Sequence, residues 1–194
     1  MTNHTTRESW LLAAVELLRP TFKEKQHIIP NNCQVSCGFA STGSKHHIGQ
    51  CWSRKSSVHD SNQIFVSPAL LDPVLVLDTL VHELVHAVDD CQHKHGKEFK
   101  KIALKVGLKG PMRGAEAGPV LKAQLLDLAQ GLGPYPHSAL KVSVRKRPQA
   151  KRPRAKCEKC DYQVPMLKKF LAYGPPICPQ HKIVMEPLGD WDDV

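Results

Sequence analysis

Two histidines and a glutamate near the middle of the chain form a pattern that can bind and use a metal ion. The residues are His82-Glu83-Leu84-Val85-His86. On a helix, side chains four residues apart lie one turn apart on the same face, so both imidazoles can reach a single ion. Glu83 lies about 100° around the helix from His82 and need not be a ligand. It is placed instead to take a proton from a water that Zn²⁺ has acidified to a pKa of about 7, as that water attacks a carbonyl group.

The segment that carries this pattern is predicted to be a buried helix. Asp72 and Pro73 suit a helix start, with Asp as N-cap and Pro at the first position, and the helix is expected to run to about Asp89. Its residues are apolar nearly all round, which is typical of a buried helix. Burying two histidines and a glutamate without partners costs several kcal/mol. A metal ion would remove that cost, so the pattern is not expected to be a chance occurrence.

A catalytic zinc site needs a third protein ligand and an open position for water. The candidates lie in Asp90-Cys91-Gln92-His93-Lys94-His95-Gly96. We select His95, because Gly96 allows a tight turn and a helix predicted over 97–106 begins directly afterwards. His93 is interpreted as an exposed histidine in mid-loop. Weaker candidates, as ligands or as partners of ligands, are Asp89, Asp90 and Cys91.

The spacing of cysteines near the C-terminus predicts a second metal site. Cys157-Glu158-Lys159-Cys160 is followed, after 17 residues, by Cys178-Pro179-Gln180-His181. This C-x₂-C…C-x₂-H arrangement is close to the spacing of a zinc ribbon, in which each of two knuckles brings a pair of ligands together. Four protein ligands close the site to water, so this zinc is predicted to be structural. It would stabilise a segment of under 40 residues, which is too short to fold on its own core.

The net charge of +9 is concentrated in one tract. Residues 141–156, KVSVRKRPQAKRPRAK, hold eight Lys or Arg and no acidic residue, so they carry eight of the nine net charges. Such a tract indicates contact with nucleic acid, and the alternative is a solvated linker. The absence of aromatic residues in the tract favours phosphate contacts over base stacking. The later lysines that suit phosphate contact are Lys168, Lys169 and Lys182.

The remaining pattern predicts an α+β fold in which a small antiparallel sheet packs with the helices. An amphipathic helix is expected over 8–19, ended by Pro20, and the last helix of the domain over 119–130. The predicted strands are Gln34–Phe39, Ile48–Trp52 and Gln63–Ser67. The predicted organisation is a metal-binding domain over 1–140, a basic linker over 141–156 and a zinc-ribbon-like minidomain over 157–194.

The cysteine count and the absence of export signals predict an intracellular protein, in the cytoplasm or with the nucleoid or nucleus. Seven cysteines are an odd number, and their spacing does not indicate a disulfide framework. No stretch approaches the ~18 apolar residues of a membrane span, and the N-terminus lacks the features of a secretion signal. The four cysteines outside the C-terminal pattern are interpreted as small core residues: Cys33, Cys37, Cys51 and Cys91.

The segment HELVHAVDD followed by HGKEF, after a segment that carries PALLDP, resembles the SprT-like, or Spartan, metalloproteases. The resemblance covers roughly residues 10–135. It implies a mixed α+β domain with His82, His86 and His95 as zinc ligands and Glu83 as the catalytic residue. It also implies that Phe99 packs under the loop. Zinc ribbons after such a domain are common in the family and resemble nucleic-acid-binding modules.

These observations lead to a zinc metalloendopeptidase that cleaves proteins bound or crosslinked to DNA. One zinc would be catalytic and one structural, and the basic tract and ribbon would hold the enzyme near its protein substrate. The alternative is a zinc-stabilised nucleic-acid-binding or transcription-associated protein without activity, which the presence of Glu83 disfavours. A third possibility is a general zinc peptidase with an incidental basic tract. The residue that stabilises the oxyanion stays open among Tyr, Arg and His candidates, and the oligomeric state is not predicted.

Overall fold

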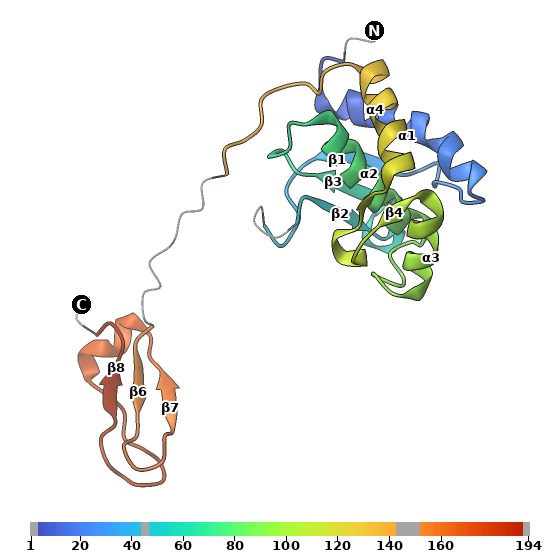
Figure 1. Ribbon diagram of the computed structural model, residues 1–194. Helices are drawn as coiled ribbons and strands as arrows, with labels where there is room; N and C mark the ends of the chain where they lie inside the picture. Colours follow the sequence, from blue (N-terminus) through green and yellow to red (C-terminus); the bar gives the residue numbers. More distant parts are fainter. Residues whose placement is uncertain (1–3, 44–46, 143–151, 192–194) are drawn as a thin grey trace. The chain divides into compact units, whose positions relative to one another are not determined.

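The computed structural model describes residues 4–43, 47–142 and 152–191, and the chain divides into two compact units, 1–142 and 143–194. The protein is a mixed α+β structure with small sheets (Figure 1). Most of the predicted basic tract, residues 143–151, lies outside the described residues. In the first unit the helices and strands are α1 (Arg7–Glu24), β1 (Gln34–Cys37), β2 (Gly49–Trp52), η1 (Arg54–Ser56), β3 (Gln63–Val66), α2 (Pro73–Val88), α3 (Lys97–Val106), β4 (Leu108–Lys109), η2 (Met112–Gly114), β5 (Glu116–Ala117) and α4 (Pro119–Leu132).

The first sheet has the strand order β1-β3-β2 and is mixed, so the prediction of an antiparallel sheet is wrong in one of its two pairings. β2 pairs antiparallel with β3, whereas β1 pairs parallel with β3. The three strands were predicted to within about two residues at each end. Their direction was not readable, because the alternation of side chains in a strand is the same whichever way its neighbour runs. β2 is an edge strand, and its position beside α2 makes it a wall of the site described below.

The first helix is longer than predicted and contains the proline that was expected to end it. α1 begins at a capping box in which Thr6 Oγ1 accepts a hydrogen bond from the Ser9 main-chain N–H at 3.1 Å. It continues past Pro20 to Glu24. A proline inside a helix removes one hydrogen bond and crowds the preceding turn. Here the extra turn places Phe22 in the core with no exposed surface, and this apolar burial opposes the cost.

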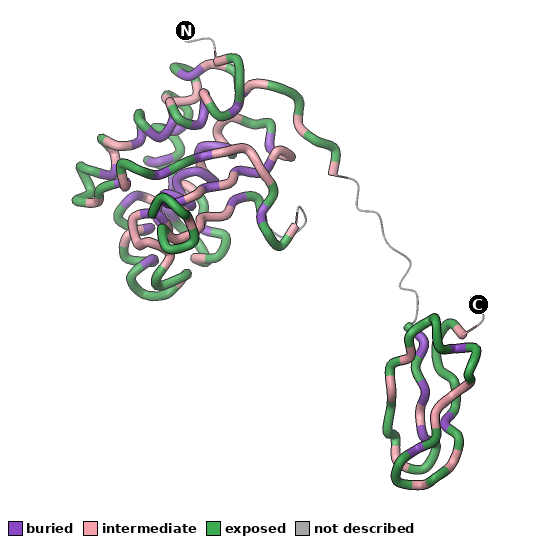
Figure 2. Tube along the Cα trace, turned by 180° about the vertical axis from the view of Figure 1, so that it is seen from behind, coloured by how far each residue is buried: buried purple, intermediate pink, exposed green. Residues whose placement is uncertain are grey.

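The second helix forms the centre of the first unit and begins as predicted. The Asp72 carboxylate accepts a hydrogen bond from the Leu75 N–H at 2.9 Å, and Pro73 occupies the first turn. α2 packs against β2, β3, α3 and α4, while α1 packs against β1 and α4. Figure 2 shows the buried residues gathered in the interior of this unit and the exposed ones along its outer loops. Because α2 is covered on most sides, its polar residues are held in a largely apolar setting.

The segment after α4 is attached to α1. The buried Arg7 guanidinium donates hydrogen bonds to the main-chain oxygens of Pro136 and Ser138 at 3.0 and 2.9 Å. Trp10 donates from its indole to the Gly133 oxygen at 3.1 Å and meets the Tyr135 ring edge-on at a centroid distance of 5.0 Å. These contacts close the first unit by joining its two ends.

The second unit has its own small sheet, made of β6 (Arg154–Lys156), β7 (Gln163–Pro165) and β8 (Glu186–Leu188), with η3 (Lys168–Tyr173) between the last two. The order is β7-β6-β8 and both pairings are antiparallel. β6 is formed by the last three residues of the predicted linker. Its central residue, Ala155, is fully buried in a cluster with Cys157, Cys178 and Met185. So small a core agrees with a segment that needs a further source of stability. Among the described residues, no helix has the length and apolar character to cross a membrane.

Candidate metal centres

The three histidines chosen from the sequence meet at one point in the first unit. His82 and His86 extend from successive turns of α2, and His95 lies directly before α3. His95 Nε2 is 3.3 Å from His82 Nε2 and 3.2 Å from His86 Nε2. Below them lies Phe99, fully buried, with its ring centroid 4.3 Å from that of His86 and 5.0 Å from that of His95. Phe99 therefore has the packing role that the family resemblance implied.

The spacing and protonation of these rings fit a metal ion. Nitrogens bound tetrahedrally to an ion at 2.0–2.1 Å lie about 3.3 Å apart, close to the two distances observed. Burial lowers the pKa of His82 to about 4 and that of His86 to about 3, and it also lowers the pKa of His95. All three rings are therefore neutral near pH 7, with lone pairs available for an ion. The group is compatible with zinc.

Glu83 faces the same cavity but is held by the neighbouring strand. Its pKa is raised to about 8 by burial, and a hydrogen bond from the Cys51 main chain on β2 opposes that shift. Gly49 permits this approach: a Cβ there would lie 2.6 Å from Glu83 Oε1 and 2.7 Å from Thr79 Cγ2. The cavity has a volume of about 590 Å³ and is lined by all three histidines and Glu83. A carboxylate beside an open metal position has the arrangement that water activation requires.

The wall formed by β4, η2 and β5 is attached to α2 at two points. His82 hydrogen-bonds through its ring to the Ala115 main chain, which fixes the ring and leaves Nε2 directed at His95. One turn earlier on α2, Asp78 Oδ1 accepts the Ala117 N–H at 2.8 Å. Burial raises the pKa of Asp78 to about 6. Neither contact was found from the sequence, because the partners are more than 30 residues apart and involve main-chain atoms that no motif marks.

The loop between α2 and His95 is shaped by the residues that were weaker ligand candidates. Asp89 pairs with the exposed His93 at 2.7 Å, and Asp90 accepts hydrogen bonds from the Arg54 main chain and the Asn62 side chain at 2.9 and 3.0 Å. Left-handed backbone at Asp90, Cys91 and Lys94 turns the chain sharply. This explains how eight residues bring His95 back over His86. The three weaker candidates and His93 lie outside the ligand group.

The four other cysteines lie in or beside the core of the first unit. Cys33 is buried and Cys51 packs against the core. Cys37 Sγ accepts a hydrogen bond from Arg7 at 3.4 Å, and Cys91 Sγ lies 3.5 Å from the Cys51 main-chain oxygen. Within the described residues, none of them joins a group with metal-binding geometry.

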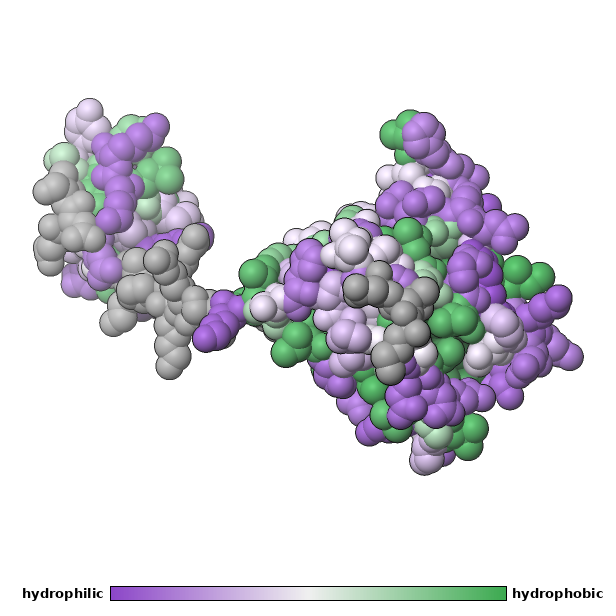
Figure 3. All heavy atoms as spheres, turned by 90° about the horizontal axis from the view of Figure 1, so that it is seen from above, coloured by the Kyte–Doolittle hydropathy of each residue, from purple (hydrophilic) through white to green (hydrophobic). Residues whose placement is uncertain are grey.

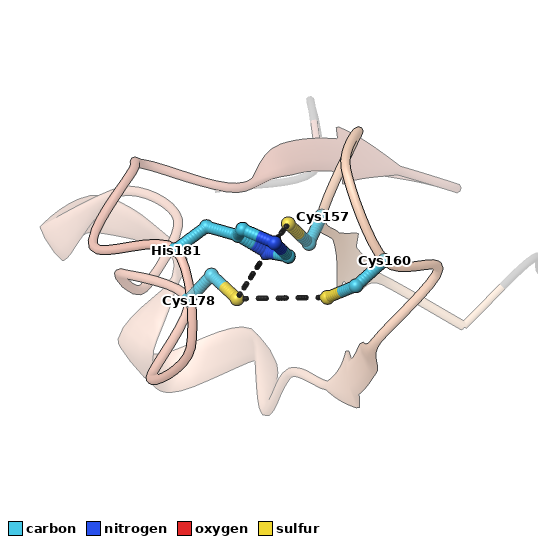
Figure 4. A group of neighbouring side chains, drawn as sticks. All are labelled: Cys157, Cys160, Cys178 and His181. Carbon is cyan, nitrogen blue, oxygen red and sulfur yellow. Dashed lines mark hydrogen bonds between the residues drawn. The ribbon is translucent and has the colours of Figure 1, made fainter.

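A second convergent group lies in the second unit and contains the four residues predicted from spacing. Figure 4 shows Cys157, Cys160, Cys178 and His181 pointing toward one another from the loops beside the sheet. Cys160 Sγ is 3.8 Å from Cys178 Sγ, and His181 Nδ1 is 3.7 and 3.8 Å from the sulfurs of Cys157 and Cys178. A tetrahedral ion bound at 2.3 Å by sulfur and about 2.05 Å by nitrogen would separate such atoms by about 3.8 and 3.6 Å. This group too is compatible with zinc.

The second group has no position left for water, unlike the first. Hydrogen bonds, led by one from the His181 main chain, lower the pKa of Cys178 to about 6, which favours the thiolate that a metal binds. Four donors fill a tetrahedral coordination shell, so an ion bound by this group would have a structural role.

Comparison with known proteins gave no match to a family model, to a curated protein or to a solved structure.

Proposed function

We propose that this chain is a zinc-dependent endopeptidase that acts on proteins associated with nucleic acid. The observation that supports it most directly is Glu83, a buried carboxylate in the same cavity as three neutral histidines. A site used only for structure needs four protein ligands and has no use for a base. Within the described residues this group has three. The SprT-like fold that the sequence resembles is part of the same proposal.

The ion would be held by His82, His86 and His95. When bound, it would act as a Lewis acid that polarises a carbonyl group and acidifies water. A cation held by these rings also favours the ionised form of Glu83, against the effect of burial. Glu83 then takes a proton from the attacking water, whose oxygen bonds to the carbonyl carbon. As the C–N bond breaks, Glu83 returns the proton to the leaving amine and is again ionised.

The proposed nucleic-acid contact is supported by the surface of the second unit as well as by the basic tract. In η3, Tyr173 is 85% exposed and its ring centroid lies 6.3 Å from that of Phe170, over which Lys169 Nζ lies at 4.7 Å. Exposed aromatic rings beside a cation are a combination found on surfaces that bind single-stranded nucleic acid. Figure 3 shows hydrophobic residues beside hydrophilic ones on the visible face of this unit. The tract alone, which has no aromatic residue, did not indicate this feature.

The second candidate is a nucleic-acid-binding protein without enzymatic activity. The closed group in the second unit supports it, because a role in nucleic-acid binding alone would explain why that group is present. The test that separates the two is Glu83→Gln in the full chain. The amide keeps the size of the carboxylate and cannot accept the proton, so cleavage of a DNA-bound protein should fall at least about 100-fold. Zinc content and DNA binding should stay unchanged.

Glu116→Gln is the matched control, because Glu116 is an exposed glutamate that lines the same cavity. This variant should keep most of the activity. Equal rates for wild type and Glu83→Gln would show that the proposed mechanism is wrong. No cleavage by the wild type, with zinc and DNA present, would favour the binding protein.

A further inference from the structure

We propose that Arg113 binds the oxygen of the substrate carbonyl and stabilises the negative charge that develops there during cleavage. This assignment depends on the proposed peptidase function and deepens it by naming the group that complements Glu83. Among the described residues, the cationic or ionisable basic side chains that line the cavity, apart from the three ligands, are His47, Lys94 and Arg113, and no tyrosine lines it.

The backbone segment that carries Arg113 is attached to α2, the helix of His82 and His86. Arg113 lies on η2, two residues before Ala115, whose main chain hydrogen-bonds to His82. The same hairpin is attached to Asp78 through the Ala117 N–H at 2.8 Å. The two contacts are one turn apart along α2, so they fix both the position and the tilt of the hairpin. Arg113 lines the same cavity as His82, His86 and His95.

The proposed base and the proposed cation occupy different walls of the cavity. Glu83 is held by β2, through Cys51 and the close approach of Gly49. Arg113 belongs to the β4–β5 hairpin, whose Ala115 main chain hydrogen-bonds to His82. A peptide carbonyl between these walls can be attacked by water from the Glu83 side while its oxygen faces the guanidinium. Transition-state stabilisation requires this separation, because the oxygen that gains charge is not the atom that is attacked.

The Arg113 side chain is available for such a contact. It makes no hydrogen bond or ion pair with another residue in the described part of the chain, and it is exposed to the cavity. A guanidinium has five N–H donors and stays charged at every relevant pH. His47 is a less suitable group, because with Nδ1 in contact with Thr42 Oγ1 at 2.7 Å it offers at most one further N–H donor, whereas a guanidinium offers five. Lys94 lies in the turn that positions His95, and its flexible ammonium lacks the fixed geometry of the arginine.

The experiment compares Arg113→Ala and Arg113→Lys with wild type in the full zinc-loaded chain. Removing one oxyanion donor lowers kcat by about 10²–10³-fold in well-studied enzymes, and we expect a loss of this size in Arg113→Ala with KM changed only a few-fold. Arg113→Lys should recover part of kcat, and so should guanidinium ion added to Arg113→Ala. Lys109→Ala, which removes an exposed cation from the same hairpin at a position that does not line the cavity, is the matched control and should keep kcat within a few-fold.

A second readout does not depend on cleavage. A peptide phosphonate carries negative oxygens where the tetrahedral intermediate has them, so its binding should weaken in Arg113→Ala by about the same factor as kcat. A peptide hydroxamate lacks this tetrahedral centre, and its affinity should change little. Measured zinc content should equal that of wild type, which separates loss of the cation from loss of the metal.

Three outcomes would overturn the assignment. An Arg113→Ala variant that cleaves and binds phosphonate like an active wild type would show that Arg113 has no such role. A loss of kcat and of phosphonate binding in His47→Ala instead would assign the role to His47. A wild type that neither cleaves protein nor binds phosphonate would overturn the proposed function, and the role of Arg113 with it.

Discussion

At the scale of single residues, burial sets the protonation of the groups that would do the chemistry. His82 and His86 are kept neutral, with pKa values of about 4 and 3, because a charged imidazole is poorly solvated inside the first unit. The same burial raises the pKa of Glu83 to about 8. In the chain without metal, the ligands are therefore ready to bind and the base is largely protonated. A bound cation would favour the ionised form of Glu83 and would leave the histidines neutral.

These opposite shifts predict that the histidines and Glu83 contribute opposite slopes to the stability of the metal-free first unit on the two sides of pH 6.5. Below pH 6.5 the two histidines bind protons in the unfolded chain and not in the folded one, so their contribution to the free energy of unfolding falls as pH falls toward 4, while Asp78, whose pKa is raised to about 6, opposes part of that fall. Above pH 6.5, Glu83 is ionised in the unfolded chain and still protonated in the folded one, so the free energy of unfolding falls again as pH rises toward 8. Urea unfolding with a chelator, at pH 4.5, 6.5 and 8.5, measures both changes.

Glu83→Gln is the control for this pH dependence. It should retain the fall toward acid pH and lose the part of the fall above pH 6.5 that comes from Glu83. If the variant and the wild type lose the same stability between pH 6.5 and 8.5, the raised pKa of Glu83 is not a property of the folded chain.

At the scale of secondary-structure elements, the site depends on how closely the edge strand β2 approaches α2. Gly49 is the point of contact, because any side chain there would meet Glu83 and Thr79 at less than 3 Å. The atoms that would clash belong to a packed helix, so they cannot move away without cost. Glycine here serves close packing rather than an unusual backbone angle.

Gly49→Ala is predicted to displace Glu83 and to lower cleavage strongly while zinc binding persists. Overpacking of this kind costs about 1–3 kcal/mol of stability. The three histidines that would bind zinc lie at other positions, two on α2 and one before α3. We therefore expect Gly49→Ala to displace them less than it displaces Glu83. The measurements are kcat, zinc content and the free energy of unfolding. Gly114→Ala is the matched control, since it lines the same cavity and a Cβ there meets nothing within 4 Å. Equal activity in both variants would contradict the proposed role of Gly49.

At the scale of the whole molecule, the two units have candidate metal-binding groups of different character. The first has three histidines beside an open cavity, and the second has three cysteines and one histidine that face one another. This division separates a group suited to chemistry from a group suited to stability.

The full chain is therefore predicted to bind about two zinc ions. His86→Ala and Cys178→Ser should each reduce the number to about one by metal analysis, because each removes a ligand from a different group. Cys178→Ser should also make the second unit sensitive to proteolysis, since its own core is small. A wild-type value near one would contradict one of the two groups, and the variant that leaves it unchanged would show which.

Nucleic-acid binding is predicted to have an electrostatic part and a stacking part. Neutral residues in place of the Arg and Lys of 145–154 should flatten the dependence of log K on log salt, by about 0.7 for each phosphate of a single strand that the chain no longer neutralises. Tyr173→Ala should weaken binding to single-stranded DNA and leave that slope unchanged, because a neutral ring releases no counterions. Titrations at several salt concentrations measure both. An unchanged slope after neutralising the tract would show that the tract is only a linker.

The sequence by itself determined the features that depend on residues close together in the chain. Helical periodicity places His82 and His86 on one face, the C-x₂-C and C-x₂-H spacings bring their own ligands together, and Asp72 with Pro73 begins α2. These are local constraints of backbone geometry, and the structure places the seven predicted ligands in the two predicted groups.

Only the tertiary structure decided what depends on distant segments. It showed that α1 continues through Pro20, that β1 runs parallel to β3, and that Gly49 contacts Glu83. It also placed Arg113 in the cavity and the Ala115 main chain beside His82. Such contacts are made by burial and by main-chain hydrogen bonds between segments tens of residues apart. These contacts cannot be predicted from side-chain type and local spacing, because many sequences can supply a main-chain carbonyl or a glycine at the place where the fold requires one.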